Sequence, residues 1–107
     1  MFARILDYEV KLEKKEEFVK VLNKEVLPIL GKQTGFLEVL PFFPENTKEK
    51  VITISLWATK ADAERYEKEF YPKVSEIIKP YLATPIVVRP YIVETTLCQH
   101  FVDALAA

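Results

Sequence analysis

Hydrophobic and polar side chains alternate most regularly along residues 51–57, Val-Ile-Thr-Ile-Ser-Leu-Trp. Because successive side chains of a β-strand point to opposite faces, this stretch is predicted to be a strand with two different faces. Ile52, Ile54 and Leu56 form a purely aliphatic row, which we expect to pack in the core. The opposite row combines small hydroxyls with one indole, as expected for the lining of a cavity or an interface; it consists of Val51, Thr53, Ser55 and Trp57.

Three further stretches have the composition of strands: 2–11, 36–43 and 84–95. The first carries polar side chains on both faces, whereas the second is apolar on nearly all of both. Pro41 lies inside the second and cannot donate a ladder hydrogen bond, which indicates an edge position, a bulge or the end of the strand. The charged segment 44–50 is predicted to be a hairpin loop.

Residues 12–30 have the spacing of an amphipathic helix, with an apolar stripe opposite a row of lysine and glutamate. Pro28 removes one backbone donor and crowds the preceding turn. We therefore expect either a kink near Leu27 or a stop followed by a short restart with Pro28 in its first turn. Gly31 is predicted to be the C-terminal cap of this helix, and 31–35 a turn.

A second helical region follows the strand at 51–57. Thr59 is predicted to be its N-cap, with Asp62 three residues later as a capping box. Pro72 begins a further helical stretch, and Pro80 closes it.

The resulting order, βαββαβ with short loops, is that of the split βαβ or ferredoxin-like fold. This α+β fold is a four-stranded antiparallel sheet with its helices on one face. Residues 1–96 are expected to form this single domain, and 97–107 a C-terminal tail. Phe101 and Leu105 lie one turn apart in that tail, which is compatible with a short helix.

Two helices can cover only one face of such a sheet, yet several of the predicted strands are apolar on both faces. An open apolar face of that size exceeds what a monomer ordinarily exposes to water. We therefore expect a homodimer in which the open faces of two sheets pack against each other.

Composition limits the remaining possibilities. The 107 residues carry 15 basic and 16 acidic side chains, so no basic surface for nucleic acid is predicted. The N-terminus has neither a signal peptide nor a membrane span, and a cytoplasmic location is expected. The single cysteine, Cys98, excludes an intrachain disulfide, and the single histidine, His100, makes a poor metal site alone. No metal and no cofactor are predicted.

The candidate site residues include four aromatic side chains. Trp57 is a candidate to stack on an aromatic substrate, and Tyr8 and Tyr66 to hydrogen-bond a phenolic oxygen or steer its deprotonation. Tyr91 is a candidate to bind the same substrate. The alternative for each is ordinary packing in the core or in the dimer interface.

Three charged strand residues are further candidates for substrate binding. Asp7 lies mid-strand, where burial would raise its pKa and suit it to act as a base. Arg4 and Arg89 lie on the first and last strands, where their guanidinium groups are candidates to bind an anionic substrate. The alternative is a set of salt bridges at the surface or at an interface.

Four stretches have the character of scaffold motifs: Met-Phe-Ala-Arg-Ile at 1–5, Thr-Gly-Phe at 34–36, Ser-Leu-Trp at 55–57 and the strand near 85–93. They resemble the motifs of the antibiotic biosynthesis monooxygenase-like proteins, which are dimeric α+β barrels. The resemblance covers residues 1 to about 95. The family usually has Pro-Gly-Phe at the second of these positions. The resemblance implies a small-molecule pocket between helices and sheet in each subunit.

Within this family, some members oxidise polycyclic aromatic phenols with molecular oxygen and no cofactor, whereas others degrade haem. Haem-degrading relatives carry an asparagine on the first strand, a tryptophan on the third and a histidine on the second helix. Asp7 and Trp57 stand near the first two places, but that helix has glutamates and no histidine, which disfavours haem. The resemblance thus implies binding of an aromatic or quinone-type molecule, with cofactor-independent monooxygenation as the candidate activity. A non-catalytic ligand-binding or assembly module is the alternative.

Overall fold

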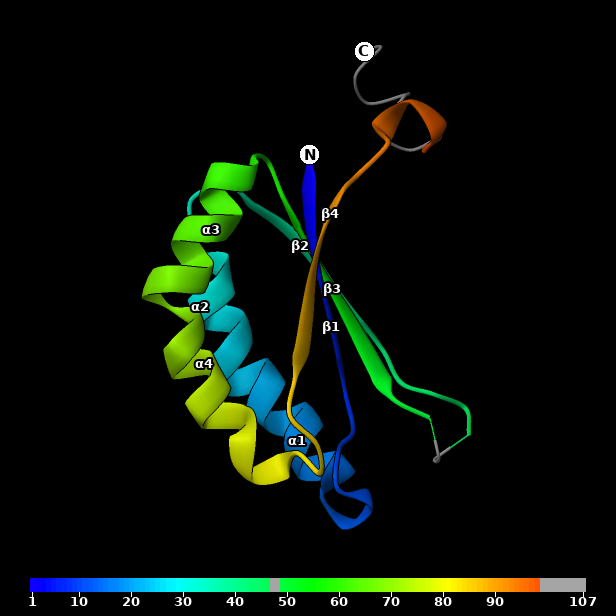
Figure 1. The fold of residues 1–107 in the computed structure, drawn as a ribbon. Helices are drawn as coiled ribbons and strands as arrows, with labels where there is room; N and C mark the ends of the chain where they lie inside the picture. Colours follow the sequence, from blue (N-terminus) through cyan, green and yellow to red (C-terminus); the bar gives the residue numbers. More distant parts are fainter. Residues whose placement is uncertain (47–48, 99–107) are drawn as a thin grey trace.

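A four-stranded antiparallel sheet is the centre of the fold. The computed structural model describes residues 1–46 and 49–98. The sheet has the order β2-β3-β1-β4. Its strands are β1 (Phe2–Tyr8), β2 (Phe36–Phe42), β3 (Val51–Trp57) and β4 (Val87–Ile92). The ferredoxin-like topology predicted from the sequence is confirmed (Figure 1).

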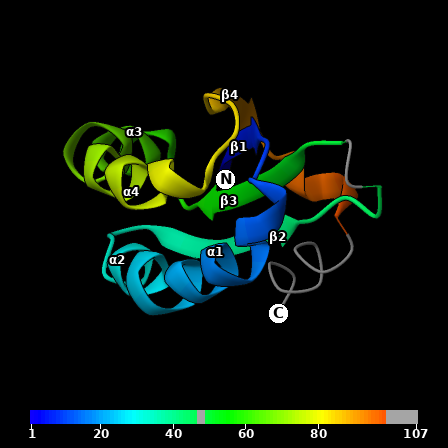
Figure 2. The same cartoon turned by 90° about the horizontal axis from the view of Figure 1, so that it is seen from below.

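All of the longer helices cover one face of this sheet (Figure 1). They are α1 (Lys15–Val21), α2 (Leu27–Gly31), α3 (Lys60–Glu69) and α4 (Tyr71–Ile78). Viewed from below, α1 and α2 lie beside β2, whereas α3 and α4 lie on the side of β1 and β4 (Figure 2). Short 3₁₀ turns complete the chain at Leu12–Lys14, Lys79–Tyr81 and Thr95–Leu97.

A π-helical segment, Leu22–Val26, joins α1 to α2. Pro28 lies in the first turn of α2, as one of the two sequence-based alternatives predicted, but the helix does not stop before it, because Val26 and Leu27 keep right-handed helical backbone angles. The wide π turn was not predicted. Because proline has no backbone N–H to donate, the hydrogen-bond register of the helix changes before Pro28, and the π turn allows the helix to continue through this change. The predicted cap at Gly31 is wrong, because α2 ends there with Lys32 as its C-cap.

The buried face of the sheet differs from the one predicted. Ile52, Ile54 and Leu56 point away from the helices, and Ile52 is 42% exposed. The opposite row faces the helices, with Trp57 fully buried. Both rows are apolar enough to be core, and the helices cover the row with the largest ring because it fills the gap between the layers.

The predicted strands at 2–11 and 84–95 are longer than the observed ones. β1 ends at Tyr8 and β4 begins at Val87. The intervening residues pair irregularly instead, since Lys11 N–H bonds the carbonyl of Tyr81 at 2.8 Å. His100 and most of the predicted tail helix lie outside the described residues.

The junction between β3 and α3 contains the predicted cap. The Thr59 hydroxyl accepts a hydrogen bond from the Asp62 backbone N–H at 3.1 Å, which confirms Thr59 as N-cap. Gly35, at the start of β2, has a φ of 80° and packs against the Asp62 carboxylate. Its carbonyl accepts the Ala58 N–H at 2.8 Å. The turn before β2 is thereby tied to the start of α3.

Candidate functional site

A cavity of about 290 Å³ lies between the helices and the sheet. Arg4, Leu6 and Tyr8 of β1 form one part of its wall, and Thr53 and Ser55 of β3 continue it. The rest comes from β2 and from all four helices. The two hydroxyl residues of β3 were predicted to line a cavity or an interface, and they line a cavity.

The cavity has a buried end and an exposed rim. Arg4 and Tyr66 at the inner end are buried, whereas the side chains at the rim are exposed. The rim consists of Val19, Asn23 and Leu27 from the first helical run and Pro41 from β2. The mouth therefore lies between the helix containing the π turn and the edge strand.

Arg4 is the one charged side chain among the described residues that line the cavity. It is only 3% exposed, and its Nε and Nη2 atoms have no hydrogen-bond acceptor among the described residues. The nearest carboxylate oxygen, Oε1 of Glu67, is 3.7 Å from Nη2, which is too long for a hydrogen bond. Leaving such a buried group unpaired costs about 1–3 kcal/mol.

Two tyrosine rings flank this guanidinium. Its central carbon lies 4.6 Å from the ring centroid of Tyr71 and 5.2 Å from that of Tyr66. These are cation–π distances, so both rings stabilise the charge. Nε and Nη2 are left without a hydrogen-bond acceptor among the described residues, and Nη2 has only the long ion pair with Glu67.

Burial keeps the tyrosine hydroxyls of the cavity protonated. It raises the pKa of Tyr66 to about 12, with Arg4 opposing the increase. Burial likewise raises the pKa of Tyr8, against a hydrogen bond of 2.8 Å to the Thr53 hydroxyl, and raises the pKa of Tyr71. At neutral pH these groups are hydrogen-bond donors rather than bases.

Trp57 lies one layer behind the cavity wall. It is fully buried and stacks on Tyr66 with ring centroids 5.0 Å apart, while its Nε1 donates to the Ser55 hydroxyl at 3.0 Å. Both of these neighbours line the cavity, whereas Trp57 does not. Its position fits support of the wall rather than direct stacking on a ligand.

Asp7, Arg89 and Tyr91 are not brought together with the cavity. Asp7 is buried on the opposite face of the sheet, where Arg89 Nη1 lies 2.9 Å from its Oδ2. Tyr91 is 50% exposed on that same face. A role for these three residues in substrate binding stays a prediction, but none of them lines the cavity that Arg4 lines.

Tyr71 is a cavity residue that the sequence analysis missed. Residues five apart on an uninterrupted helix lie about 140° apart, so Tyr66 and Tyr71 would face different directions. The helix is broken at Phe70, which brings the two rings to a centroid distance of 6.2 Å. Pro72, placed just after the break, is the sequence signal that marks it.

The described lining residues include no carboxylate, histidine, lysine or cysteine. Elsewhere in the described part of the chain, no group of three or more metal-binding side chains lies together. No described helix is long and apolar enough to cross a membrane. The arrangement is thus an apolar cavity with hydroxyl donors and one buried cation, suited to an aromatic ligand with a polar oxygen.

The fold and the cavity define a class: a ferredoxin-like α+β domain with an apolar cavity between helices and sheet. Within that class, residues 1–72 match the antibiotic biosynthesis monooxygenase family. The chain belongs to this family, and the resemblance seen in its sequence motifs is confirmed. The comparison with curated proteins gave no match.

Solved structures share the fold at low sequence identity. SnoaB, a cofactor-independent oxygenase from Streptomyces nogalater, has a TM-score of 0.74 at 12% identity, over 91% of this chain and 96% of that chain. A candidate antibiotic biosynthesis monooxygenase from Caulobacter crescentus has a TM-score of 0.72 at 18% identity, over 87% of this chain and 90% of that chain. A conserved protein from Methanosarcina mazei has a TM-score of 0.68 at 16% identity, over 85% of this chain and 91% of that chain. At these identities the likeness concerns the fold alone.

Proposed function

We propose that the cavity binds a small, planar aromatic molecule and that the protein oxidises it with molecular oxygen and no cofactor. The observation that carries this proposal is the apolar, aromatic-walled cavity itself, in a chain that belongs to the antibiotic biosynthesis monooxygenase family. A fold of this kind packed solid by its own side chains would instead favour a purely structural or assembly module.

The size of the cavity sets the size of the ligand. An engineered protein cavity of about 150 Å³ accommodates benzene. At about 290 Å³, the cavity in this protein has room for roughly two fused rings. A two-ring phenol such as 1-naphthol is therefore the appropriate probe.

The proposed reaction draws its electrons from the substrate. Loss of the phenolic proton gives an electron-rich anion that reduces oxygen, and a new C–O bond forms at the ring carbon opposite the hydroxyl. For 1-naphthol the products are 1,4-naphthoquinone and water. One oxygen atom enters the ring, and the other leaves as water with the two hydrogen atoms removed from the substrate.

The protein's own groups position the substrate for this reaction. Tyr8 and Tyr66 are protonated at neutral pH and donate hydrogen bonds toward the substrate oxygens. Apolar side chains from the helices exclude water from the ring faces. Trp57 holds the Tyr66 ring from behind by stacking.

Oxygen consumption with 1-naphthol tests the activity directly. We expect protein-dependent formation of 1,4-naphthoquinone above the rate of autoxidation. Tyr66→Phe should lower turnover roughly 10- to 100-fold, because a hydrogen-bond donor to the developing charge is removed. Tyr81→Phe is the matched control, since Tyr81 does not line the cavity. An equal turnover in Tyr8→Phe, Tyr66→Phe and the unmodified protein contradicts the proposed roles.

Naphthol binding without any product formation would favour the non-catalytic alternative, a ligand-binding module. Haem remains the weaker possibility, because the described cavity residues include neither a histidine nor a cysteine to act as axial ligand. A haem titration followed at the Soret band distinguishes it.

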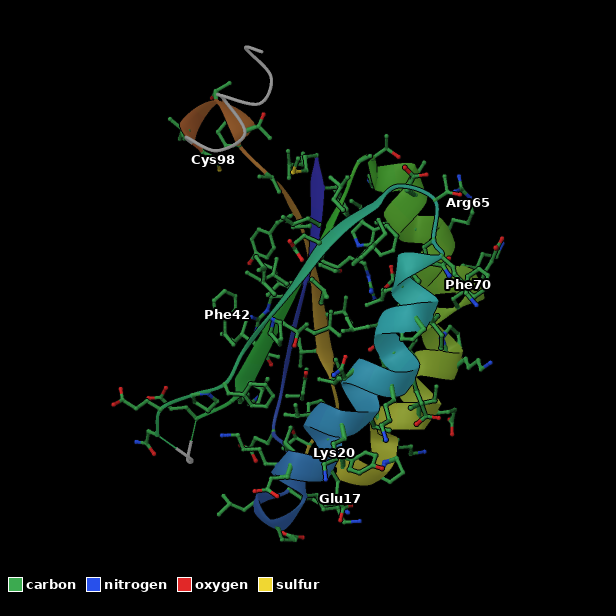
Figure 3. All side chains as sticks on the ribbon, turned by 180° about the vertical axis from the view of Figure 1, so that it is seen from behind. Glu17, Lys20, Phe42, Arg65, Phe70 and Cys98 are labelled. Atoms are coloured by element: carbon green, nitrogen blue, oxygen red, sulfur yellow. The ribbon has the colours of Figure 1, made fainter. Side chains whose placement is uncertain are left out.

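We also propose that a second copy of the chain covers the open face of the sheet. Phe42 and Ile52 are 52% and 42% exposed there. Figure 3 shows Phe42 pointing from β2 to the side away from the helices. Tyr91, Leu40 and Val87 are also exposed on the open face. Contact with an identical face would remove this apolar surface from water.

A further inference from the structure

We propose that the ligand is an anion and that the guanidinium group of Arg4, the charged group in the cavity wall, binds its charged oxygens. The inference rests on the proposed function, since it assumes that the cavity is a ligand site. It adds the chemical class of the ligand: an aromatic ring system that bears one carboxylate or ionised hydroxyl group.

The position of Arg4 is fixed by the sheet. It lies on the central strand β1, opposite Ser55 of β3 and Pro90 of β4, on the face that the helices cover. A side chain there cannot reach bulk water by extending past the edge of the sheet, and it is 97% removed from solvent. The charge is therefore held inside the protein layer that contains the cavity.

The described residues around Arg4 do not balance the positive charge of its guanidinium group well. Glu67 is the only carboxylate paired with Arg4 among the described residues, at 3.7 Å, and its side chain is 48% exposed on α3. None of the described residues that line the cavity is acidic. A buried cation that serves only the fold is ordinarily matched by hydrogen bonds to acceptors with good geometry. Here two of its nitrogen atoms have none.

A guanidinium group has the geometry of an oxyanion site. Two of its nitrogen atoms form a fork that matches the two oxygens of a carboxylate, or binds a single phenolate oxygen. Tyr66 and Tyr71 hold the plane of the guanidinium at its faces, so the fork can rotate little. The rest of the cavity is apolar, as a ring system attached to that oxyanion requires.

An anionic ligand also explains how the proposed reaction proceeds without a general base among the described cavity residues. No described side chain of the cavity is suited to remove a proton at neutral pH. A positive charge beside a bound hydroxyl lowers the pKa of that hydroxyl, so the substrate can lose its proton to water and bind as the anion. The positive charge of Arg4 would then promote loss of the substrate's proton, a step that a general base promotes in other enzymes.

A pair of isosteric probes tests the inference. We expect the unmodified protein to bind 2-naphthoate roughly 10- to 100-fold more tightly than neutral 2-naphthamide in calorimetric titrations at pH 7, as expected for a charge-assisted hydrogen bond. Arg4→Met should abolish this preference while keeping the binding of 2-naphthamide. Arg65→Met, which removes one positive charge from the exposed surface of α3, should leave the preference unchanged.

The possible results separate the two proposals. Equal affinity for both probes in the unmodified protein overturns the inference and leaves the proposed aromatic pocket standing. Binding of neither probe overturns both. Retention of the preference in a folded Arg4→Met variant shows that another group binds the anion, which also overturns the inference.

If Arg4→Met does not fold, Arg4→Lys provides the second variant. It keeps the charge but replaces the fork by a single ammonium group, so the preference for 2-naphthoate should fall without disappearing. Glu67→Gln removes the distant carboxylate and should preserve or increase the preference. A decrease in Glu67→Gln, or no change in Arg4→Lys, contradicts the assignment of the fork.

Discussion

At the scale of single residues, the inner end of the cavity combines three tyrosine hydroxyls that are costly to ionise with one buried guanidinium group. Tyr8, Tyr66 and Tyr71 all have their hydroxyl pKa raised by burial. Arg4 lies against two of these rings. The result is a site in which a buried guanidinium lies beside neutral hydrogen-bond donors.

The pKa of Tyr66 makes a prediction about stability at high pH. In the folded protein this pKa is about 12, against an ordinary value of 10.0, so folding favours the protonated phenol. The associated stability is fully present below pH 10 and is lost as the pH rises toward 12, because the unfolded chain releases the proton first. A difference of about two pKa units corresponds to roughly 2–3 kcal/mol.

Urea unfolding at pH 9 and pH 11 measures this effect. The free energy of unfolding should fall more steeply with pH in the unmodified protein than in Tyr66→Phe, which has no proton to release at that position. Parallel pH profiles for the two proteins would contradict the assigned pKa. Tyr8 and Tyr71 contribute in the same direction in both proteins, so the comparison isolates Tyr66.

At the scale of secondary-structure elements, two junctions are specific to this chain, and the first of them forms part of the cavity wall. The π turn between α1 and α2 widens the helix where Leu22 and Val26 face the cavity and Asn23 lies at the rim. Extra residues in a π turn are often found at functional sites. The second junction ties the turn before β2 to the first turn of α3, through Gly35 and Asp62.

Gly35→Ala should destabilise the protein by roughly 2–3 kcal/mol. The left-handed backbone is unfavourable for alanine, and the added methyl group would displace the Asp62 side chain from the N-cap of α3. Gly31→Ala is the matched control, because nothing lies within 4 Å of the new methyl group. It should be neutral, or stabilising by up to about 1 kcal/mol, in a helix.

Chemical denaturation midpoints of the two alanine variants provide the measurement. Similar midpoints for Gly35→Ala and Gly31→Ala would mean that the close approach of Gly35 to Asp62 does not hold the junction together.

At the scale of the whole molecule, the sheet has two different faces. One contains the cavity and the helices. The other exposes aromatic and aliphatic side chains around the Asp7–Arg89 ion pair. An apolar face with a charged pair near its centre is suited to a self-complementary contact about a twofold axis. The assembly proposal therefore belongs to the open face, separate from the cavity.

Light scattering after gel filtration tests this assembly. The unmodified protein should be dimeric at micromolar concentration. Phe42→Asp should weaken the dimer by roughly 30-fold or more, since a charge is introduced into the apolar patch. Leu12→Asp is the control, because Leu12 is an exposed apolar residue away from the strands of the open face. A monomeric unmodified protein at this concentration overturns the proposal.

The order and type of the elements were predictable because they depend on local patterns. Strand alternation marked β3, Thr59 marked the start of α3, and Pro28 marked the first turn of α2. The choice of the covered face was not predictable. Both rows of β3 are compatible with burial, so that choice depends on which row matches the helices that pack against it.

The candidate site was predicted only in part, for the same reason. Arg4, Tyr8 and Tyr66 come together around one cavity, although they lie far apart in the chain. Asp7 directly precedes Tyr8 in the chain and yet faces the opposite side of the sheet, since neighbouring strand residues alternate. Tyr71 joins the cavity because the helix breaks at Phe70, and no periodic pattern shows where its ring points.

Short-range chemistry in the chain was thus sufficient for the ferredoxin-like topology, the N-cap of α3 and the membership of the antibiotic biosynthesis monooxygenase family. Long-range packing decided which face of the sheet is buried, where the cavity opens, and that Arg4 is left without a hydrogen-bond acceptor at two of its nitrogen atoms. The physical reason is that periodicity is encoded by neighbours along the chain. The environment of a buried charge is the sum of contributions from strands and helices that only the folded structure brings together.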